Sequence, residues 1–206
     1  MQETGPGRII RALGRNVAFQ DVCCVAFHAY MSLRVLLAPD GPDASAARPE
    51  ALALLLITSS VVLLVRGEVL RPGLARALLY RVGMVAPMVL SYLALRHLLP
   101  ALRPQLLDAA FLRLDERIFG VTPARWLARF ASPPVVEWFA FFYYSYFALL
   151  SLHILGSLFL DRGRRMSELL LGAMLVTGVG HTLYTLFPGA GPWVALRFDA
   201  PLQGHL

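Results

Sequence analysis

The sequence predicts an all-α integral membrane protein with about five transmembrane helices. Two observations lead to this fold class. Hydrophobic residues make up 57% of the 206 residues and charged residues only 16%, whereas a soluble domain of this length carries more charge. The chain also contains five long apolar stretches, each approaching the roughly 20 residues that a helix needs to cross a bilayer. We expect one helical membrane domain over residues 1–206.

The first three predicted spans each depart from an uninterrupted apolar helix in a different way. Residues 17–38 are interrupted by several polar or charged side chains, Asp21 among them. Residues 51–65 are apolar but short for a bilayer. Residues 77–99 contain Pro87, where we expect a kink because proline cannot donate a helical hydrogen bond.

Residues 138–160 and 169–188 contain no charged residue and predict the fourth and fifth spans. The basic residues, all of them Arg, gather before the first span, between the second and third, and between the fourth and fifth. These segments share one side of the membrane if all five spans form, and the positive-inside rule makes that side the cytoplasm. We therefore expect a cytoplasmic N-terminus. The membrane itself we expect to be a bacterial inner membrane. The closing residues 183–206 then form a loop on the outer, periplasmic face.

The third connection, residues 100–133, is too regularly patterned for a simple loop. Apolar residues recur in it at spacings of four, three and four, which places them on one face of a helix. They are Leu107, Phe111, Leu114 and Ile118. Thr122 is in position to cap a second short helix that has Pro123 at its first position. We expect one or two amphipathic helices over residues 106–131, lying in the membrane interface.

Four arginines of this segment are expected to contact the phosphates of lipid headgroups. They are Arg113, Arg117, Arg125 and Arg129. A fully buried core helix is the alternative for the segment, and these charges argue against it. The adjacent Asp115 and Glu116 point about 100° apart on a helix, so they predict no acid–base pair. We expect the two carboxylates to balance neighbouring arginines.

Composition and spacing argue against several other classes of function. The net charge is +6, but no basic tract is interleaved with aromatic residues, so we expect no nucleic-acid partner. Cys23 and Cys24 are neighbours, which suits neither an ordinary disulfide nor a metal site. We expect membrane lipids as partners and neither a metal nor a cofactor. A small transporter would need paired ionisable residues, and the last two spans offer only His153 and His181.

The closing stretch starts as a helix and breaks at "FPGAGP", residues 187–192. Proline ends the helical hydrogen-bond ladder, and Gly189 and Gly191 allow turns with positive φ. A loop of this kind can present backbone N–H groups to an anion, and Arg197 follows closely enough to add a cation. The alternative is a solvent-facing turn with no ligand.

The predicted span before this loop carries a second candidate. His181, Tyr184 and Pro188 lie three and four residues apart and so share a helix face. A histidine within an apolar span is costly to bury, which makes it a functional candidate. A histidine hydrogen-bonded to a neighbouring helix is the alternative. The other histidines of the spans, His28, His97 and His153, are isolated in the sequence, which favours structural roles.

Two stretches of the sequence resemble a known family. They are "LDERIFGVTPARWLARFASPPVVEWFAFFYYSYF" (114–147) and "HTLYTLFPGAGPWVAL" (181–196). In this order they are similar to the membrane-bound type 2 phosphatidic acid phosphatase superfamily, and most similar to its branch of inositol phosphorylceramide synthases and bacterial relatives. The shared elements include Asp-x-x-x-Phe-Gly from Asp115, Pro-x-x-Trp-Leu from Pro123 and Tyr-x-x-Phe-Pro-x-x-Gly-Pro from Tyr184.

The resemblance implies six transmembrane helices and a site on the outer face. It also implies hydrolysis or transfer of lipid phosphates through a phosphohistidine intermediate, without a metal. In the family an Asp activates the nucleophilic His, a second His assists, and fixed positive charge stabilises the transition state. The residues of this chain that are candidates for substrate binding are His181, Tyr184, Pro188, Gly189, Gly191, Pro192 and Arg197.

The family's later catalytic elements, Pro-Ser-Leu-His and His-x-x-x-Asp, do not occur in the 206 residues. We therefore assign no catalytic residue. We expect either a truncated copy without the sixth helix and the catalytic half, or an inactive relative. The functional hypothesis is a lipid phosphatase- or phosphotransferase-like membrane protein, and the alternative is a non-enzymatic lipid-binding or scaffold protein of the membrane.

Overall fold

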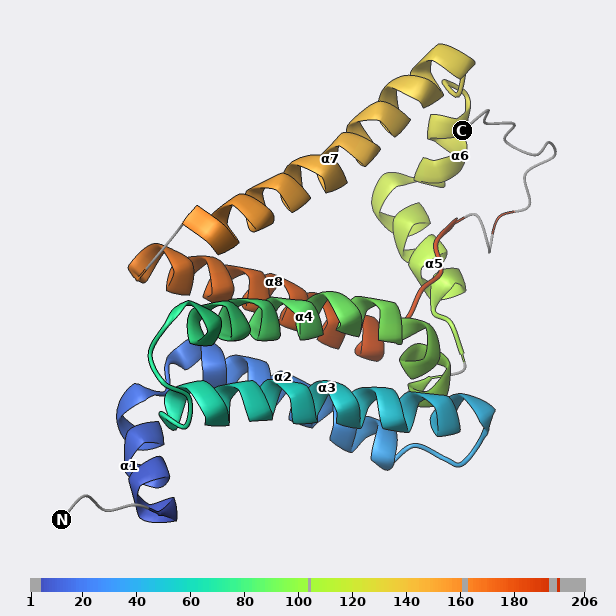
Figure 1. Cartoon of the computed structure of the whole chain (residues 1–206). Helices are drawn as coiled ribbons and strands as arrows, with labels where there is room; N and C mark the ends of the chain where they lie inside the picture. The colour runs from blue at the N-terminus through green and yellow to red at the C-terminus, as the bar shows by residue number, and fades with distance from the viewer. Residues whose placement is uncertain (1–4, 104, 161–162, 193–195, 197–206) are drawn as a thin grey trace. The chain divides into compact units, whose positions relative to one another are not determined.

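The computed structural model describes residues 5–103, 105–160, 163–192 and 196. These residues form eight α-helices and no strand, so the predicted all-α membrane fold class is confirmed. The helices are α1 (Pro6–Asn16), α2 (Phe19–Leu36), α3 (Pro42–Arg66), α4 (Leu74–Leu102), α5 (Asp108–Phe119), α6 (Pro123–Ala128), α7 (Pro133–Leu160) and α8 (Arg164–Leu186) (Figure 1).

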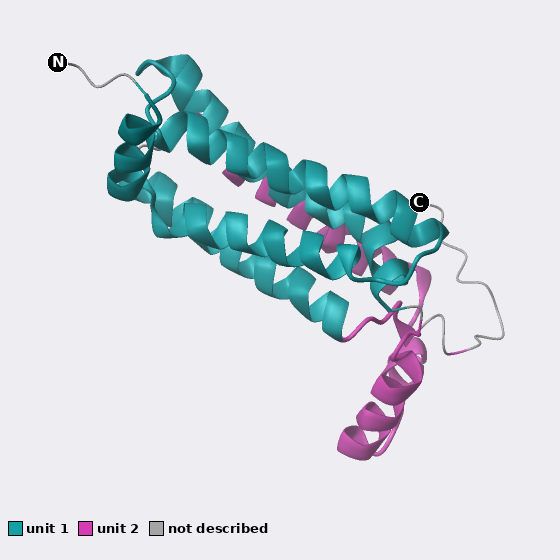
Figure 2. Cartoon of the chain, turned by 90° about the horizontal axis from the view of Figure 1, so that it is seen from below, with its two compact units in different colours: residues 1–104, 160–186 teal, residues 105–159, 187–206 magenta. Residues whose placement is uncertain are grey.

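The chain divides into two compact units (Figure 2). Unit 1 comprises residues 1–104 and 160–186 and contains α1 to α4 and α8. Unit 2 comprises residues 105–159 and 187–206 and contains α5, α6, nearly all of α7 and the segment after α8. The residues that the sequence singled out are therefore distributed over both units.

Unit 1 is a bundle in which α2, α3, α4 and α8 run side by side (Figure 1). The helix α3 packs most extensively against α4 and α2, and α8 packs against α2 and α4. Small residues allow the close approach, since a Cβ on Gly83 of α4 would lie 2.5 Å from Val61 Cγ2 of α3. The Ser32 hydroxyl of α2 donates to the Ala51 carbonyl of α3 at 3.0 Å.

Four helices of the described chain are long and apolar enough to cross a membrane: α3, α4, residues 133–157 of α7, and α8. They correspond to the second to fifth predicted spans. The helix α2 forms where the first span was predicted, but it is not among the four because its polar residues lower its hydropathy. The expected set of about five spans is thus reduced to four in the described part of the chain.

The helix α3 begins at Pro42, nine residues before the predicted span 51–65, so that boundary was wrong. Proline is favourable in the first turn of a helix, and the alanines that follow it are strong helix formers. Two alanines of the extra turns, Ala44 and Ala47, are buried, so packing also stabilises these turns.

The helix α1 was not expected, because an 11-residue segment with two glycines has little helical tendency of its own. Tertiary contacts hold its end in place. The Asn16 side-chain amide donates to the Arg66 carbonyl at 3.1 Å and to Glu68 Oε1 at 2.9 Å.

A buried polar cluster joins α2, α3 and α4. The Asp21 carboxylate accepts hydrogen bonds from Arg66 Nε at 2.7 Å and from the Tyr80 hydroxyl at 2.6 Å. Arg66 Nη2 also donates to the Tyr80 hydroxyl, at 2.7 Å. Asp21 is 1% exposed, so the charge that interrupts the first predicted span is paired inside the bundle.

In unit 2, α5 and α6 form within residues 106–131, where one or two amphipathic helices were predicted. The helix α5 ends at Phe119, and the next residue, Gly120, has a left-handed φ of 69°. Thr122 directly precedes Pro123 at the start of α6, as predicted. Its hydroxyl donates to Glu116 Oε1 at 2.9 Å and makes no cap, so the predicted position is confirmed and the predicted capping bond is wrong.

Candidate functional site

The closing loop of unit 2 packs on the first turn of α5. The Leu107 N–H donates to the Pro188 carbonyl at 2.8 Å. Asp108, the first residue of α5, accepts from the Ala190 N–H on Oδ2 at 3.1 Å and from the Gly191 N–H on Oδ1 at 2.8 Å. Three hydrogen bonds therefore join segments that are more than 80 residues apart in the chain.

The loop does present consecutive backbone N–H groups to an anion, and that anion is the Asp108 carboxylate. Asp108 is 8% exposed and uses both oxygens in the contact. The contact satisfies both N–H groups and uses both carboxylate oxygens as acceptors. A phosphate could reach these two donors only by displacing Asp108.

The two glycines of the loop differ in backbone conformation and in how closely they approach α5. Gly191 has a φ of 106°, in the region that only glycine adopts without strain, so the expected positive φ is confirmed there. Gly189 has no left-handed φ, so the same expectation was wrong for it. A Cβ on Gly189 would lie 3.2 Å from Phe111 Cε2 and 3.4 Å from Asp108 Oδ1, so the loop lies tightly against α5 at this position.

The Leu196 N–H donates to the Pro192 carbonyl at 2.7 Å. Arg197, the expected cation of the loop, lies outside the described residues.

His181 and Tyr184 belong to α8 in unit 1. The His181 ring is buried, its Nδ1 lies 3.1 Å from the Ser91 hydroxyl of α4, and it packs near Phe27 of α2. This is the arrangement of a histidine hydrogen-bonded to a neighbouring helix. Tyr184 is about half exposed. Because α8 ends at Leu186, Pro188 does not share a helix face with these two residues, and that expectation was wrong.

The four arginines expected to contact headgroups are all exposed: Arg113, Arg117, Arg125 and Arg129. Among the residues that the structure describes, none of the four makes an ion pair or a hydrogen bond through its side chain. Glu116 instead accepts the hydroxyl of Thr122. The expectation that Asp115 and Glu116 balance neighbouring arginines was therefore wrong, and the four guanidinium groups are available to an external anion.

The remaining histidines show one pairing that the sequence did not indicate. His97 of α4 lies with its Nδ1 2.9 Å from Glu50 Oε1 of α3. The two residues are 47 positions apart, so no local pattern signals the pair. His28 binds the Cys24 carbonyl through Nδ1 at 2.9 Å, and His153 is exposed on α7. No three His, Cys, Asp or Glu side chains gather as a metal site within the described ranges.

Comparison with known proteins bears on the second half of the chain. Residues 109–204 match the family model of the PAP2 superfamily, which supports the superfamily assignment over that part of the chain. The matched region runs from α5 through α8 to the closing loop. Together with the four apolar helices, the match identifies a membrane protein. No curated protein and no solved structure matches the chain.

Proposed function

We propose that this PAP2-superfamily-like membrane protein acts on lipid phosphates or phosphorylated lipid headgroups. The observation that carries the proposal is the match of residues 109–204 to the superfamily. The finer proposal is that the protein resembles the inositol phosphorylceramide synthase branch and works at the outer, periplasmic face of a bacterial inner membrane.

The exposed arginines of α5 and α6 are the groups best suited to hold the phosphate. They are cationic and unpaired in the described chain, and they alternate with exposed apolar side chains such as Ile118 and Trp126. A helix with this alternation lies at the level of the lipid headgroups, with its cations toward the phosphates. The closing loop acts as a wall of the site that Asp108 keeps in shape, and Arg197 remains a candidate for a further cation.

A second candidate function is lipid binding without chemistry. The superfamily reaction needs a nucleophilic histidine and an acidic partner. Of the two described histidines in the matched region, His181 is bonded to Ser91 and His153 lies beside no carboxylate. We name no catalytic residue. The exposed arginines of α5 and α6, which can hold an anionic headgroup without any chemistry, support the non-enzymatic lipid-binding or scaffold role.

The test uses the 206-residue chain in detergent with short-chain phosphatidic acid, in the presence of a metal chelator. Binding and release of inorganic phosphate are measured on the same samples. We expect saturable binding of phosphatidic acid over the matching phosphatidylcholine. Changing the four arginines of α5 and α6 together to Gln is expected to weaken binding more than about tenfold, whereas the matched change to Lys retains most of it.

The outcomes separate the two functions. Release of phosphate by the chain would establish the enzymatic function, and binding without release would favour the lipid-binding one. Equal affinity for the two lipids, or equal binding by the Gln variant, would overturn the proposed function.

A further inference from the structure

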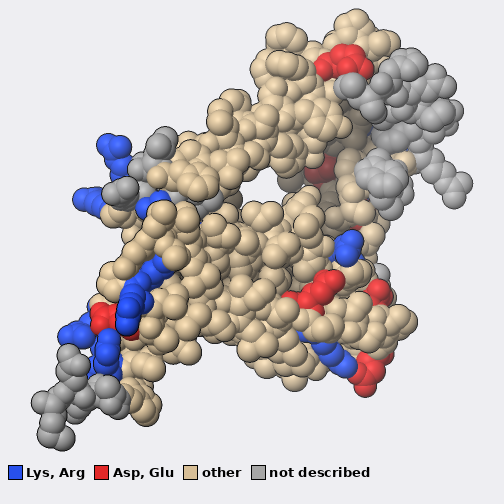
Figure 3. Space-filling model, viewed as in Figure 1, with Lys and Arg blue, Asp and Glu red and all other residues tan. Residues whose placement is uncertain are grey.

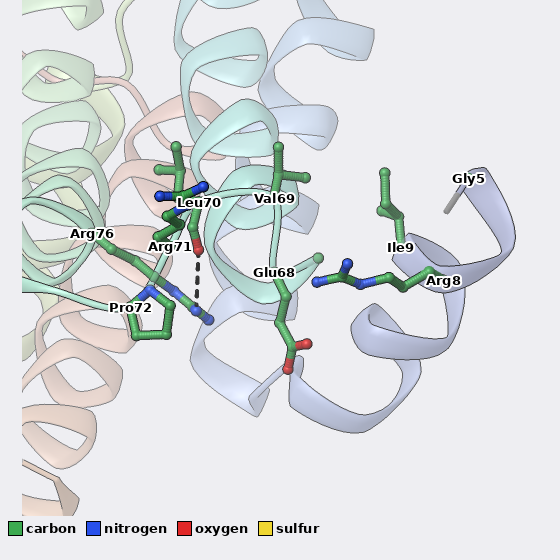
Figure 4. Close-up of a pocket in the computed structure, with 10 residues that line it drawn as sticks. Gly5, Arg8, Ile9, Glu68, Val69, Leu70, Arg71, Pro72 and Arg76 are labelled. Carbon is green, nitrogen blue, oxygen red and sulfur yellow. Dashed lines mark hydrogen bonds between the residues drawn. The ribbon is translucent and has the colours of Figure 1, made fainter. Parts of the chain in front are cut away.

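Unit 1 contains a cavity of about 630 Å³ between the start of α1 and the connection from α3 to α4. Figure 4 shows Arg8 extending from α1 toward the connection that carries Glu68. Three of its lining residues are arginines, Arg8, Arg71 and Arg76, and only Glu68 is acidic. The cavity therefore has an excess of positive charge.

Two of these arginines are available to a ligand. Arg76 is committed to the protein, since its Nη2 donates to the Val65 carbonyl at 2.6 Å and its Nη1 to the Leu70 carbonyl at 3.4 Å (Figure 4). Arg8 and Arg71 are exposed, and neither forms an ion pair or side-chain hydrogen bond with any residue that the structure describes. Glu68 accepts its hydrogen bond from Asn16.

The walls of the cavity are held in one shape. Glu68 has a φ of 55°, a left-handed conformation that is costly for a residue with a side chain. At Gly67 a Cβ would lie 2.9 Å from Ile9 Cγ2 of α1 and 2.4 Å from the Leu63 carbonyl oxygen, so only glycine fits. The backbone N–H groups of Val69 and Leu70 both donate to the Leu64 carbonyl at 3.2 Å. The backbone of the connection is thus held in one conformation, which fixes the position from which the Arg71 side chain extends.

The cavity lies where two candidate membrane helices meet. The helix α3 ends at Arg66 and α4 begins at Leu74, so their connection is at a membrane surface if both cross. Around it, Ile10 is 68% exposed and Leu74 is 75% exposed. Figure 3 shows basic side chains gathered at this end of unit 1, and an uncharged surface along the helices behind it. Cations beside exposed apolar side chains are typical of the headgroup layer of a bilayer.

We propose that this cavity binds the phosphate headgroup of an anionic phospholipid, held by Arg8 and Arg71. On the orientation that the sequence predicts, the lipid belongs to the cytoplasmic leaflet. This cavity is distinct from the phosphate site of the proposed function, because its lining residues precede the superfamily match of 109–204 in the chain. The 29 residues of α4 rise about 43 Å from this cavity to the other end of the helix.

The test locates the lipid directly. The full chain in phosphatidylcholine nanodiscs receives a phosphatidic acid analogue with a photoreactive diazirine beside its headgroup, and the crosslinked peptides are mapped after illumination. We expect crosslinks in residues 5–9 and 67–76. The double variant Arg8→Gln/Arg71→Gln is expected to lower crosslinking there roughly 25-fold, since each arginine near a membrane surface contributes about a factor of five.

The control variant, Arg15→Gln/Arg165→Gln, removes two exposed arginines that do not line the cavity and changes the net charge equally. It is expected to retain the crosslinks, and Arg8→Lys/Arg71→Lys is expected to retain most of them. Equal losses in the Gln and control pairs, or crosslinks confined to other residues, would overturn the proposal. Competition by inorganic phosphate as strong as by unlabelled phosphatidic acid would show a site for free anions and overturn the lipid assignment.

Discussion

The closing loop of unit 2 and the basic cavity of unit 1 both gather donors for an anion, but they differ in what occupies those donors. In the loop, two backbone N–H groups bind the Asp108 carboxylate. In the cavity, Arg8 and Arg71 have no partner in the described chain. A glycine–proline loop can thus be closed by an anion of its own chain, whereas arginines beside the end of a candidate membrane helix can be left for a ligand.

Removing the Asp108 carboxylate should have the largest effect on the stability of the closing loop. Asp108→Ala leaves the N–H groups of Ala190 and Gly191 without their acceptor, and we expect a loss of about 3 kcal/mol in the stability of the loop. The measurement is hydrogen exchange at these two amides in detergent, which should become fast. Asp108→Asn keeps one acceptor oxygen and should be intermediate. Unchanged protection in Asp108→Ala would show that the carboxylate does not hold the loop.

The backbone of the loop gives the next effect. Gly191→Ala places a side chain at a φ of 106°, and we expect the free energy of unfolding to fall by about 1.5 kcal/mol. Gly180→Ala is the matched control, because a Cβ there meets nothing within 4 Å in a helix. The control should leave the stability equal or raise it. Equal losses in both variants would mean that the left-handed conformation of Gly191 is not required.

The smallest effect on stability is expected for the arginines of the cavity, where Arg76 and Arg71 should differ. Arg76→Gln removes donors from the Val65 carbonyl at the end of α3 and the Leu70 carbonyl of the α3–α4 connection, and we expect a loss of about 1 kcal/mol in the free energy of unfolding. Arg71→Gln should leave the stability unchanged and lower lipid crosslinking instead. Both are measured by unfolding in detergent beside the crosslinking assay. A clear loss of stability in Arg71→Gln would contradict the proposal that the Arg71 side chain is available to bind a lipid headgroup.

Much of the fold was predictable because it depends on local patterns. The apolar runs placed the helices α4, α7 and α8, and the Thr122–Pro123 pair placed the start of α6. Predictions failed where packing adds to a weak local signal. The early start of α3 depends on buried alanines, and α1 is held by Asn16 against the α3–α4 connection.

The candidate site was predictable only in part. The loop and its need for glycine followed from Pro188, Gly189 and Gly191. Asp108 was missed, because a carboxylate that binds backbone N–H groups leaves no sign in the side chains of its partners. His97 and Glu50 were missed for a related reason, since their contact joins two helices whose register is decided by packing.

The sequence by itself determined the all-α membrane fold, the approximate positions of the apolar helices α3, α4, α7 and α8, and the loop that follows α8, because each depends on residues close together in the chain. The tertiary structure decided which charges are paired. Asp108 meets Gly191 across 83 residues and Asp21 meets Arg66 across 45, while Arg8 and Arg71 meet no described partner. Such contacts depend on how the helices pack, and the spacing of side chains along the chain does not predict that packing.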